Sequence, residues 1–167
     1  TTLGKIVGGG LPVGAFGGKR EVMSVVAPLG GVYQAGTLSG NPIAMTAGLA
    51  TLSLIEAPGF FESLTSKTEA LVSGLKSVAE ECGVALSTNQ VGGMFGFFFS
   101  PADPVTRFSE VMNSDTAMFN LFFNGMLAEG INLAPSPFES GFVSAAHTDQ
   151  NIEETLKAAR KVLSALN

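Results

Sequence analysis

The chain has 167 residues and a formal net charge of −5, from nine basic and fourteen acidic side chains. This length suits one ordinary domain or two small ones with a buried core. No stretch approaches the roughly 18–20 uninterrupted apolar residues of a membrane span, and no basic stripe favours a nucleic-acid partner. A single cysteine excludes a disulfide framework and a cysteine-rich zinc site. We therefore expect no membrane, nucleic-acid or metal partner.

The N-terminal sequence Thr-Thr-Leu-Gly-Lys lacks the charged-then-apolar pattern of a secretory signal. The sequence also contains no Asn-x-Ser/Thr glycosylation motif. With the single cysteine, these features predict a reducing, cytoplasmic location, or a plastid stroma if the source is a photosynthetic eukaryote.

Glycine is concentrated at the start of the chain, where 11 of the 21 glycines lie within the first 41 residues. Such a concentration indicates a backbone that bends sharply or approaches another group closely. A flexible leader is the alternative, but apolar residues such as Leu11, Val13 and Phe16 are interleaved with the glycines. We therefore interpret the segment as folded.

The first part of the chain contains few regular elements. We expect a short buried strand over 13–16, a short helix over 19–27 and a loop over 30–40. Asn41 and Pro42 together predict the N-cap and first position of a helix that ends before Pro58. Pro58-Gly59 is the best candidate domain boundary, which divides the chain into residues 1–57 and 58–167. Residues 1–57 are too few in elements for an independent sheet layer, so we expect them to end a larger α/β domain whose other strands lie outside this chain.

The second part alternates helices with short strands. The apolar spacing predicts an amphipathic helix over 61–82, another over 116–129 capped by Ser114 or Asp115, and a final helix capped by Thr148 or Asp149. Expected strands cover 84–87, 94–99, 131–133 and 142–144. This order predicts helices packed on one face of a small, antiparallel sheet.

Lys5 is the first candidate for chemistry. Its neighbours are glycines and the apolar pair Ile6-Val7, and a lysine desolvated by such neighbours is a nucleophilic amine suited to Schiff-base chemistry. From the residues alone, a surface lysine on a turn is the alternative. The glycines match neither the G-x-G-x-x-G nor the Walker pattern, which argues against a nucleotide loop. Residues 34–42 offer two hydroxyls and free backbone N–H groups before a helix start, so they could bind an anion such as phosphate or simply lead into the helix.

Four blocks of the sequence resemble the class III aminotransferases, which are pyridoxal-phosphate enzymes of fold type I. Residues 1–18 read TTLGKIVGGGLPVGAFGG and are similar to the segment of the family that carries the cofactor lysine, while residues 33–42 read YQAGTLSGNP and resemble a second block. Residues 93–99, GMFGFFF, and 134–144, APSPFESGFVS, resemble the aminomutase branch, in which an amino group moves within one substrate molecule. The similarity runs to the last helix.

The resemblance implies an α/β fold that forms the C-terminal portion of a fold type I pyridoxal-phosphate-dependent transferase. Residues 1–57 would end the large α/β/α domain, and residues 58–167 would form a small α+β domain with helices on an antiparallel sheet. The resemblance also implies an upstream portion with most of the cofactor cradle, which this chain lacks.

The resemblance further assigns roles to four residues. Lys5 matches the Schiff-base lysine, which binds pyridoxal 5'-phosphate and is released when the cofactor is in its pyridoxamine form. Thr37 matches a threonine that contacts the cofactor phosphate from the neighbouring subunit of a homodimer, and Tyr33 matches a tyrosine near the same site. Glu139 matches an acidic residue at the substrate end of the pocket.

The block around Glu139 also separates two expected functions. Related transaminases for ω-amino acids tend to have an arginine there that binds a substrate carboxylate, whereas residues 135–139 contain none. A small-molecule substrate with a neutral aldehyde at that end fits better, which favours an aminomutase over an ω-amino acid transaminase. We expect a capping or surface role for His147, buried packing for Cys82, and a core position for the apolar stripe over 118–126.

Overall fold

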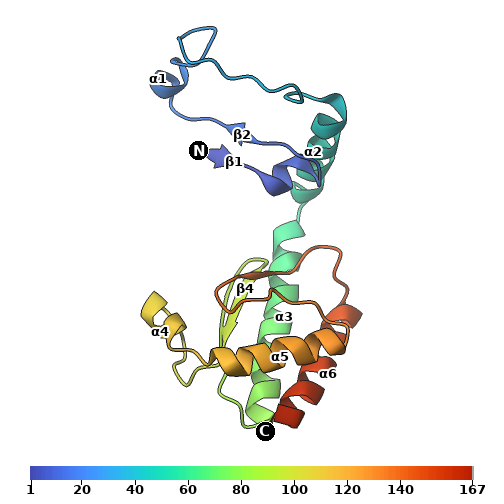
Figure 1. The fold of residues 1–167 in the computed structure, drawn as a ribbon. Helices are drawn as coiled ribbons and strands as arrows, with labels where there is room; N and C mark the ends of the chain where they lie inside the picture. Colours follow the sequence, from blue (N-terminus) through green and yellow to red (C-terminus); the bar gives the residue numbers. More distant parts are fainter. Residues whose placement is uncertain (167) are drawn as a thin grey trace. The chain divides into compact units, whose positions relative to one another are not determined.

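The computed structural model describes residues 1–166 and divides the chain into two compact units, Thr1–Phe60 and Phe61–Asn167. Their elements are labelled in Figure 1. The division between Phe60 and Phe61 lies three residues after the expected boundary at 57/58. Each unit has its own sheet, so each is described by itself.

The first unit contains short strands and one substantial helix. Its elements are β1 (Thr2–Leu3), the 3-10 helix η1 (Lys5–Gly8), β2 (Ala15–Phe16), α1 (Arg20–Met23) and α2 (Pro42–Ile55). β1 and β2 pair antiparallel, with Thr2 opposite Phe16 and Leu3 opposite Ala15. The strand expected over 13–16 is therefore shorter than predicted, because only its last two residues face a partner strand. The prediction that it is buried was wrong, since Ala15 and Phe16 are both exposed.

α1 is also shorter than the helix expected over 19–27. After α1 the chain turns, and Val26 forms a parallel bridge with Val32. The amide of Ala27 donates to Val32 O at 2.8 Å, and that of Val32 donates to Val25 O at 2.9 Å. These residues pair across a turn in place of continuing the helix.

α2 has the start that its sequence predicts. Asn41 is the N-cap, and its side-chain oxygen accepts from the amides of Ile43 at 3.1 Å and Ala44 at 3.3 Å. Pro42 occupies the first helical position, where its missing N–H is not needed. The helix ends at Ile55, before Pro58, as expected.

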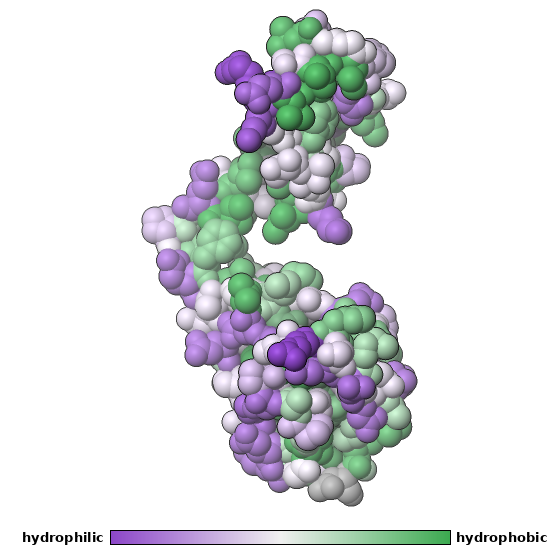
Figure 2. Space-filling model, turned by 90° about the vertical axis from the view of Figure 1, so that its left-hand side faces the viewer, coloured by the Kyte–Doolittle hydropathy of each residue, from purple (hydrophilic) through white to green (hydrophobic). Residues whose placement is uncertain are grey.

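The first unit buries very little apolar surface. Among residues 1–60 only Gly8, Ala44 and Gly48 are buried. Figure 2 shows apolar residues on the surface. The exposed large apolar side chains of this unit include Leu3, Ile6, Phe16, Val22, Val25, Leu29, Val32, Leu38, Ile43, Leu49 and Leu54. The unit therefore has no hydrophobic core of its own comparable to that of the second unit.

The second unit is a three-stranded antiparallel sheet with helices, as predicted. Its elements are α3 (Phe60–Glu81), β3 (Ser87–Val91), β4 (Met94–Phe98), α4 (Phe108–Met112), α5 (Thr116–Ala128), β5 (Gly141–Phe142) and α6 (Asp149–Leu166). The strand order is β3-β4-β5, with Val91 opposite Met94 and Met94 opposite Phe142. The three long helices α3, α5 and α6 match the predicted ones to within a few residues.

Two strand predictions for the second unit were wrong, and the strand expected over 142–144 lies at Gly141–Phe142. The strand expected over 84–87 lies at Ser87–Val91 instead. A turn at Gly92-Gly93 reverses the chain there, and it pairs residues 87–91 with β4. Gly92 has a φ of +57° in this turn. Residues 131–133 form no strand, and the amide of Ile131 closes the end of α5 by donating to Met126 O at 2.9 Å. The short α4 was not expected.

α4 begins where Glu110 folds back on the preceding residues. Its carboxylate accepts from the amides of Thr106 at 2.8 Å and Arg107 at 3.0 Å. These hydrogen bonds hold the pKa of Glu110 below its usual value.

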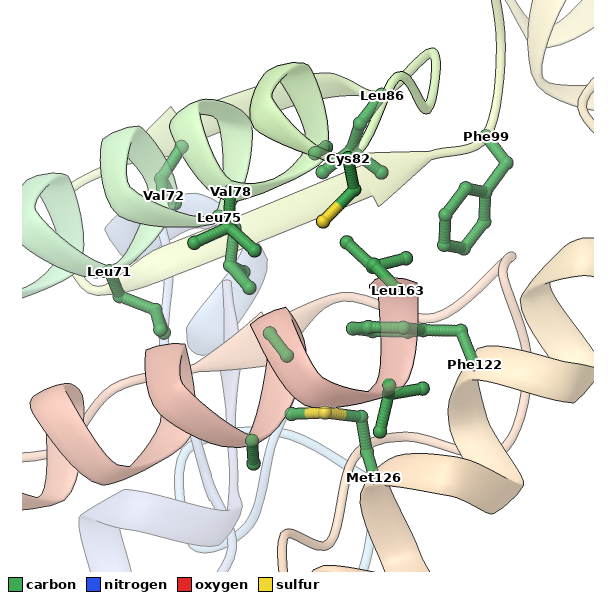
Figure 3. Packing of buried hydrophobic residues seen from close by; sticks show 14 of the residues in the cluster. Leu71, Val72, Leu75, Val78, Cys82, Leu86, Phe99, Phe122, Met126 and Leu163 are labelled. Atoms are coloured by element: carbon green, nitrogen blue, oxygen red, sulfur yellow. The ribbon is translucent and has the colours of Figure 1, made fainter. Parts of the chain in front are cut away.

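The core lies between the sheet and the three long helices (Figure 3). Phe97 stacks on Phe119 at a centroid distance of 5.7 Å and meets Phe122 edge-on at 5.7 Å. Further buried members are Leu71, Leu75, Val78, Ala79, Phe95, Phe99, Met126, Ile152, Ala159, Val162 and Leu163. The buried polar residue Thr68 is satisfied, because its hydroxyl donates to Leu64 O at 2.8 Å.

A loop outside the core is fixed to the sheet by Asp103. This carboxylate forms an ion pair with Lys76 of α3 and accepts from the buried Ser87 hydroxyl at 3.2 Å. The hydrogen bond from Lys76 is the main reason why the pKa of Asp103 lies below its usual value.

No single helix within residues 1–166 has the length and apolar composition of a membrane span.

The burial on α5 leads to a stability prediction. Met126 is 0% exposed whereas Leu121, on the same helix, is 56% exposed. We expect Met126→Ala to lower the free energy of unfolding by about 2–5 kcal/mol, because it leaves a cavity in the core. Leu121→Ala, the matched control, should lower it by less than about 1 kcal/mol. Denaturant unfolding of the two variants measures the difference, and equal losses would contradict this account of the core.

Candidate active site

Lys5 has a backbone conformation that is unusual for a side-chain-bearing residue. Its φ is +55°, and it is the only non-glycine residue with a positive φ among residues 1–166. This region costs an L-residue about 1–2 kcal/mol, so the surrounding structure must hold it. The side chain is exposed and lines a shallow hollow of about 500 Å³ with Ile6, Gly10, Leu11 and Pro12.

The residues after Lys5 form a tight turn, which we call the lysine turn (residues 5–9). Gly9 has a φ of +58°, and its amide donates to Ile6 O at 3.0 Å. The turn continues as the amide of Leu11 donates to Gly8 O at 3.0 Å. Only glycine adopts the Gly9 conformation without strain.

The lysine turn packs against α2 with almost no space between the two backbones. A Cβ atom on Gly9 would overlap the carbonyl oxygen of Ala47 and lie 2.6 Å from the Thr51 hydroxyl. A Cβ atom on Gly48, in the middle of α2, would lie 2.5 Å from Val7 O. Glycine costs a helix interior about 1 kcal/mol relative to alanine, and the close approach of Val7 accounts for its presence.

Tyr33 and Thr37 lie in the exposed segment before α2. Tyr33 is 84% exposed. Around Thr37 the segment turns twice, because the amide of Ser39 donates to Gly36 O at 2.9 Å and that of Asn41 donates to Leu38 O at 3.1 Å. The hydroxyl of Thr37 has no protein partner within residues 1–166, which leaves it able to bind a ligand.

A second hollow connects this segment with the lysine turn. It measures about 500 Å³, and its walls come from Val7, the stretch 12–15, residues on either side of Thr37 and the inner face of α2. This hollow brings the lysine turn and the 36–40 segment together. Lys5 itself lines the first hollow, with Ile6 and Pro12, so the Lys5 amine and the Thr37 hydroxyl do not share one cavity.

Glu139 lies in the second unit, in the loop before β5. Its amide donates to Ser136 O at 3.2 Å, and its side chain is exposed at a cavity of about 510 Å³. The floor of this cavity is apolar and includes Phe95 and Phe97, whereas Glu139 and His147 are polar residues of its wall. An acceptor carboxylate beside an aromatic floor can orient a small molecule that carries a donor group.

His147 closes a turn beside this cavity, and it is exposed, in agreement with the predicted surface role. Its Nδ1 accepts from the Ser144 amide at 2.9 Å and lies 3.0 Å from the Ser144 hydroxyl. Lys67 of α3 donates to the carbonyl of His147 at 2.7 Å. The cap of α6 is Thr148, whose hydroxyl accepts from the amide of Asn151 at 3.2 Å.

These groups include no metal centre, since the described part of the chain has no group of three or more His, Cys, Asp or Glu side chains that could hold a metal ion. Among the predicted site residues, Lys5 carries a primary amine. Cys82 is buried in the core of the second unit, as the sequence predicted.

Comparison with known proteins decides the family. The model of the family "Aminotransferase class-III" matches residues 1–160. The chain belongs to the class III aminotransferase family. The resemblance seen in the four sequence blocks is thereby confirmed, and so is the fold expected from it.

Three individual proteins show which kinds of class III enzyme the chain is similar to. Glutamate-1-semialdehyde 2,1-aminomutase of Laribacter hongkongensis is 55% identical over 166 residues, which cover 99% of this chain and 39% of that protein. A β-phenylalanine aminotransferase of Variovorax paradoxus has a similar structure, with a TM-score of 0.83, 30% identity, and coverage of 98% of this chain and 38% of that one. A transaminase solved with bound PLP has the same fold, with a TM-score of 0.81 at 24% identity, over 99% of this chain and 38% of that one. The chain thus spans less than half the length of these class III relatives.

The His147 turn gives a testable prediction with a matched pair of variants. Asparagine places its side-chain oxygen near the position of Nδ1, whereas glutamine places its polar atoms farther out, near Nε2. We expect His147→Gln to lower the free energy of unfolding by roughly 1 kcal/mol, because the Ser144 amide loses its acceptor. His147→Asn should stay within about 0.5 kcal/mol of the parent. The reverse order in thermal or denaturant unfolding would contradict the hydrogen bond.

Proposed function

We propose that this chain is part of an enzyme that isomerises glutamate-1-semialdehyde to 5-aminolevulinate with pyridoxal phosphate as cofactor, a reaction of tetrapyrrole biosynthesis. The observation that carries the proposal is the 55% identity to an aminomutase of that name over nearly the whole chain. Family membership over residues 1–160 supports the cofactor. The chain spans 39% of that relative, so we propose that catalysis needs the rest of such an enzyme.

The residues present fit the cofactor. Covalent attachment of an aldehyde needs a primary amine, and Lys5 offers one on an exposed and strongly bent turn. Phosphate needs hydrogen-bond donors, and the 36–40 segment offers the free hydroxyl of Thr37 and backbone amides before a helix start. Pyridoxal phosphate, when bound, supplies an electron sink for the carbon from which a proton is removed.

Lys5 would act twice in this proposal. Its amine would first hold the cofactor in place. Once released, the same amine would take a proton from one carbon and return it to another, which is the proton movement that an isomerisation requires. Substrate and product are isomers: a C–N bond breaks at C2 and one forms at C1, while the carbonyl oxygen is lost from C1 as water and a carbonyl forms at C2 by uptake of water. The exchange balances without an oxidant, a reductant or a second organic substrate.

Glu139 would orient the substrate. Residues 134–140 contain no arginine or lysine, so nothing in this loop attracts a substrate carboxylate. The Glu139 carboxylate would repel such a group and accept a hydrogen bond from an amine at the reacting end. This arrangement fits a substrate whose aldehyde and amine, in place of a carboxylate, face the loop.

Thr37 and Tyr33 would act across a homodimer interface. Tyr33 is 84% exposed, and its neighbours Leu38 and Ile43 are exposed as well. A second copy that covers this segment would bury apolar surface and bring the Thr37 hydroxyl to a cofactor held by the partner. The proposal therefore includes a phosphate site shared between two subunits. We also propose a cytoplasmic location for the assembled enzyme.

An ω-amino acid transaminase is the second candidate. The 30% identity to a β-phenylalanine aminotransferase favours it. The two reactions differ in their co-substrate, because a transaminase passes the amino group to a separate 2-oxo acid, whereas an aminomutase returns it to the same molecule.

A turnover assay on the complete protein tests the proposal. With glutamate-1-semialdehyde alone we expect 5-aminolevulinate to form without any 2-oxo acid. Lys5→Ala should lower this rate by about 10²–10⁴-fold or more, because both the attachment point and the proton carrier are lost. Lys19→Ala removes another exposed lysine of the same unit and should leave the rate within about twofold.

Two results would overturn the proposal. One is a reaction that proceeds only when a 2-oxo acid is added, which would indicate the transaminase. The other is an undiminished rate in Lys5→Ala, which would remove Lys5 from the mechanism.

A further inference from the structure

The location of the Lys5 amine depends on the backbone beneath it. Within residues 1–166, no hydrogen bond or ion pair holds the amine, and the side chain is exposed. The residue nevertheless keeps a φ of +55°, which an isolated turn would not favour. Whatever fixes the lysine turn therefore fixes the starting point of the Lys5 side chain.

The contact between the lysine turn and α2 is made by backbone atoms on both sides. The carbonyl oxygen of Val7 lies where a Cβ atom of Gly48 would be, at 2.5 Å from that position. On the other side of the same contact, Gly9 faces the carbonyl oxygen of Ala47. A backbone oxygen cannot rotate away as a side chain can, so a methyl group at residue 48 would have to displace Val7.

We propose that Gly48 is a positioning residue for Lys5. By lacking a side chain it lets the lysine turn lie directly on α2, and this contact holds Lys5 in the conformation from which its amine meets the cofactor. The inference rests on the proposed function, because it takes Lys5 as the attachment point of pyridoxal phosphate. Gly48 itself acts only through the turn and touches neither cofactor nor substrate.

The effect of a methyl group at residue 48 follows from the spacing along the chain. Val7 is two residues after Lys5 in the same 3-10 helix, so a shift of Val7 moves Lys5 with it. Misplacing a reacting group by about 1 Å can cost about 10²-fold in rate. We therefore expect Gly48→Ala to slow covalent attachment at Lys5 by about 10- to 100-fold.

The experiment measures attachment without relying on turnover. The complete protein is freed of cofactor, mixed with pyridoxal phosphate, and reduced with borohydride at increasing times. Mass spectrometry of peptides then gives the fraction of Lys5 that carries the reduced pyridoxyl group, and a thermal melt of each variant gives its stability. The variants are the parent, Gly48→Ala and a control, Gly74→Ala.

Gly74→Ala is matched because it is also a glycine-to-alanine change inside a helix. The three atoms nearest to a Cβ at residue 74 of α3 all belong to the side chain of Leu156, in the second unit. The control therefore reports what crowding and helix propensity do to stability when the lysine turn is left alone. We expect it to melt at a changed temperature but to label Lys5 at the parent rate.

Each result supports the inference or contradicts it. Labelling of Lys5 that is at least tenfold slower in Gly48→Ala than in Gly74→Ala, at similar melting temperatures, supports it. Parent-like labelling in Gly48→Ala overturns it, and so does equal slowing in both variants. If the parent itself carries no label on Lys5, the proposed function fails, whatever Gly48 does.

A milder variant decides the question if Gly48→Ala does not fold. In Gly8→Ala the new Cβ would lie 3.2 Å from Val13, so the turn needs to move by only a few tenths of an ångström. We expect labelling of Lys5 to slow by about two- to fivefold. Parent-rate labelling in a Gly8→Ala protein whose residues 5–11 have lost protection from hydrogen exchange would contradict the inference, because the turn would then have moved without an effect on Lys5.

Discussion

The close approach of two backbones in the first unit is the constraint on which the candidate site depends. Residues 1–60 bury only three residues, so side-chain packing inside this unit does little to hold Lys5 in place. Contact between the lysine turn and α2 takes over that task, and it is possible only because Gly9 and Gly48 have no side chains. In the account that we propose, the cost of two glycines, one of them inside a helix, is balanced by a fixed position for the Lys5 side chain.

The second unit has the opposite character. It has a core of aromatic and aliphatic side chains from the sheet and three helices, and it carries Glu139 on the loop before β5. Hydrogen bonds from Ser144 and Lys67 hold the turn after β5, close in sequence to that loop. The chain therefore combines a unit with few buried residues, which carries the lysine that we propose as the cofactor attachment point, and a unit with a hydrophobic core, which carries the carboxylate that we propose to face the substrate.

Much of the fold could be predicted from the sequence, because local signals determine it. The cap at Asn41 and the apolar spacing of α3, α5 and α6 act within a few residues of each other. The position of β3 could not be predicted, since it depends on pairing with β4 across the Gly92-Gly93 turn. Lys5 was a candidate from its neighbours and became a strong one only through the family resemblance. Its positive φ and its dependence on Gly48 were beyond sequence reasoning, because they arise from a contact between segments about 40 residues apart.

Hydrogen exchange at the lysine turn tests the central claim most directly. The amides of Gly9 and Leu11 donate to Ile6 O and Gly8 O. An isolated turn of this length opens readily, so we expect these amides to exchange slowly only while the turn stays packed on α2. In the complete protein we predict protection of the peptide over residues 5–11 that approaches that of α2, and selective loss of it when residue 48 gains a methyl group. Exchange of residues 5–11 at the rate of an unstructured chain, beside a protected α2, would contradict the account.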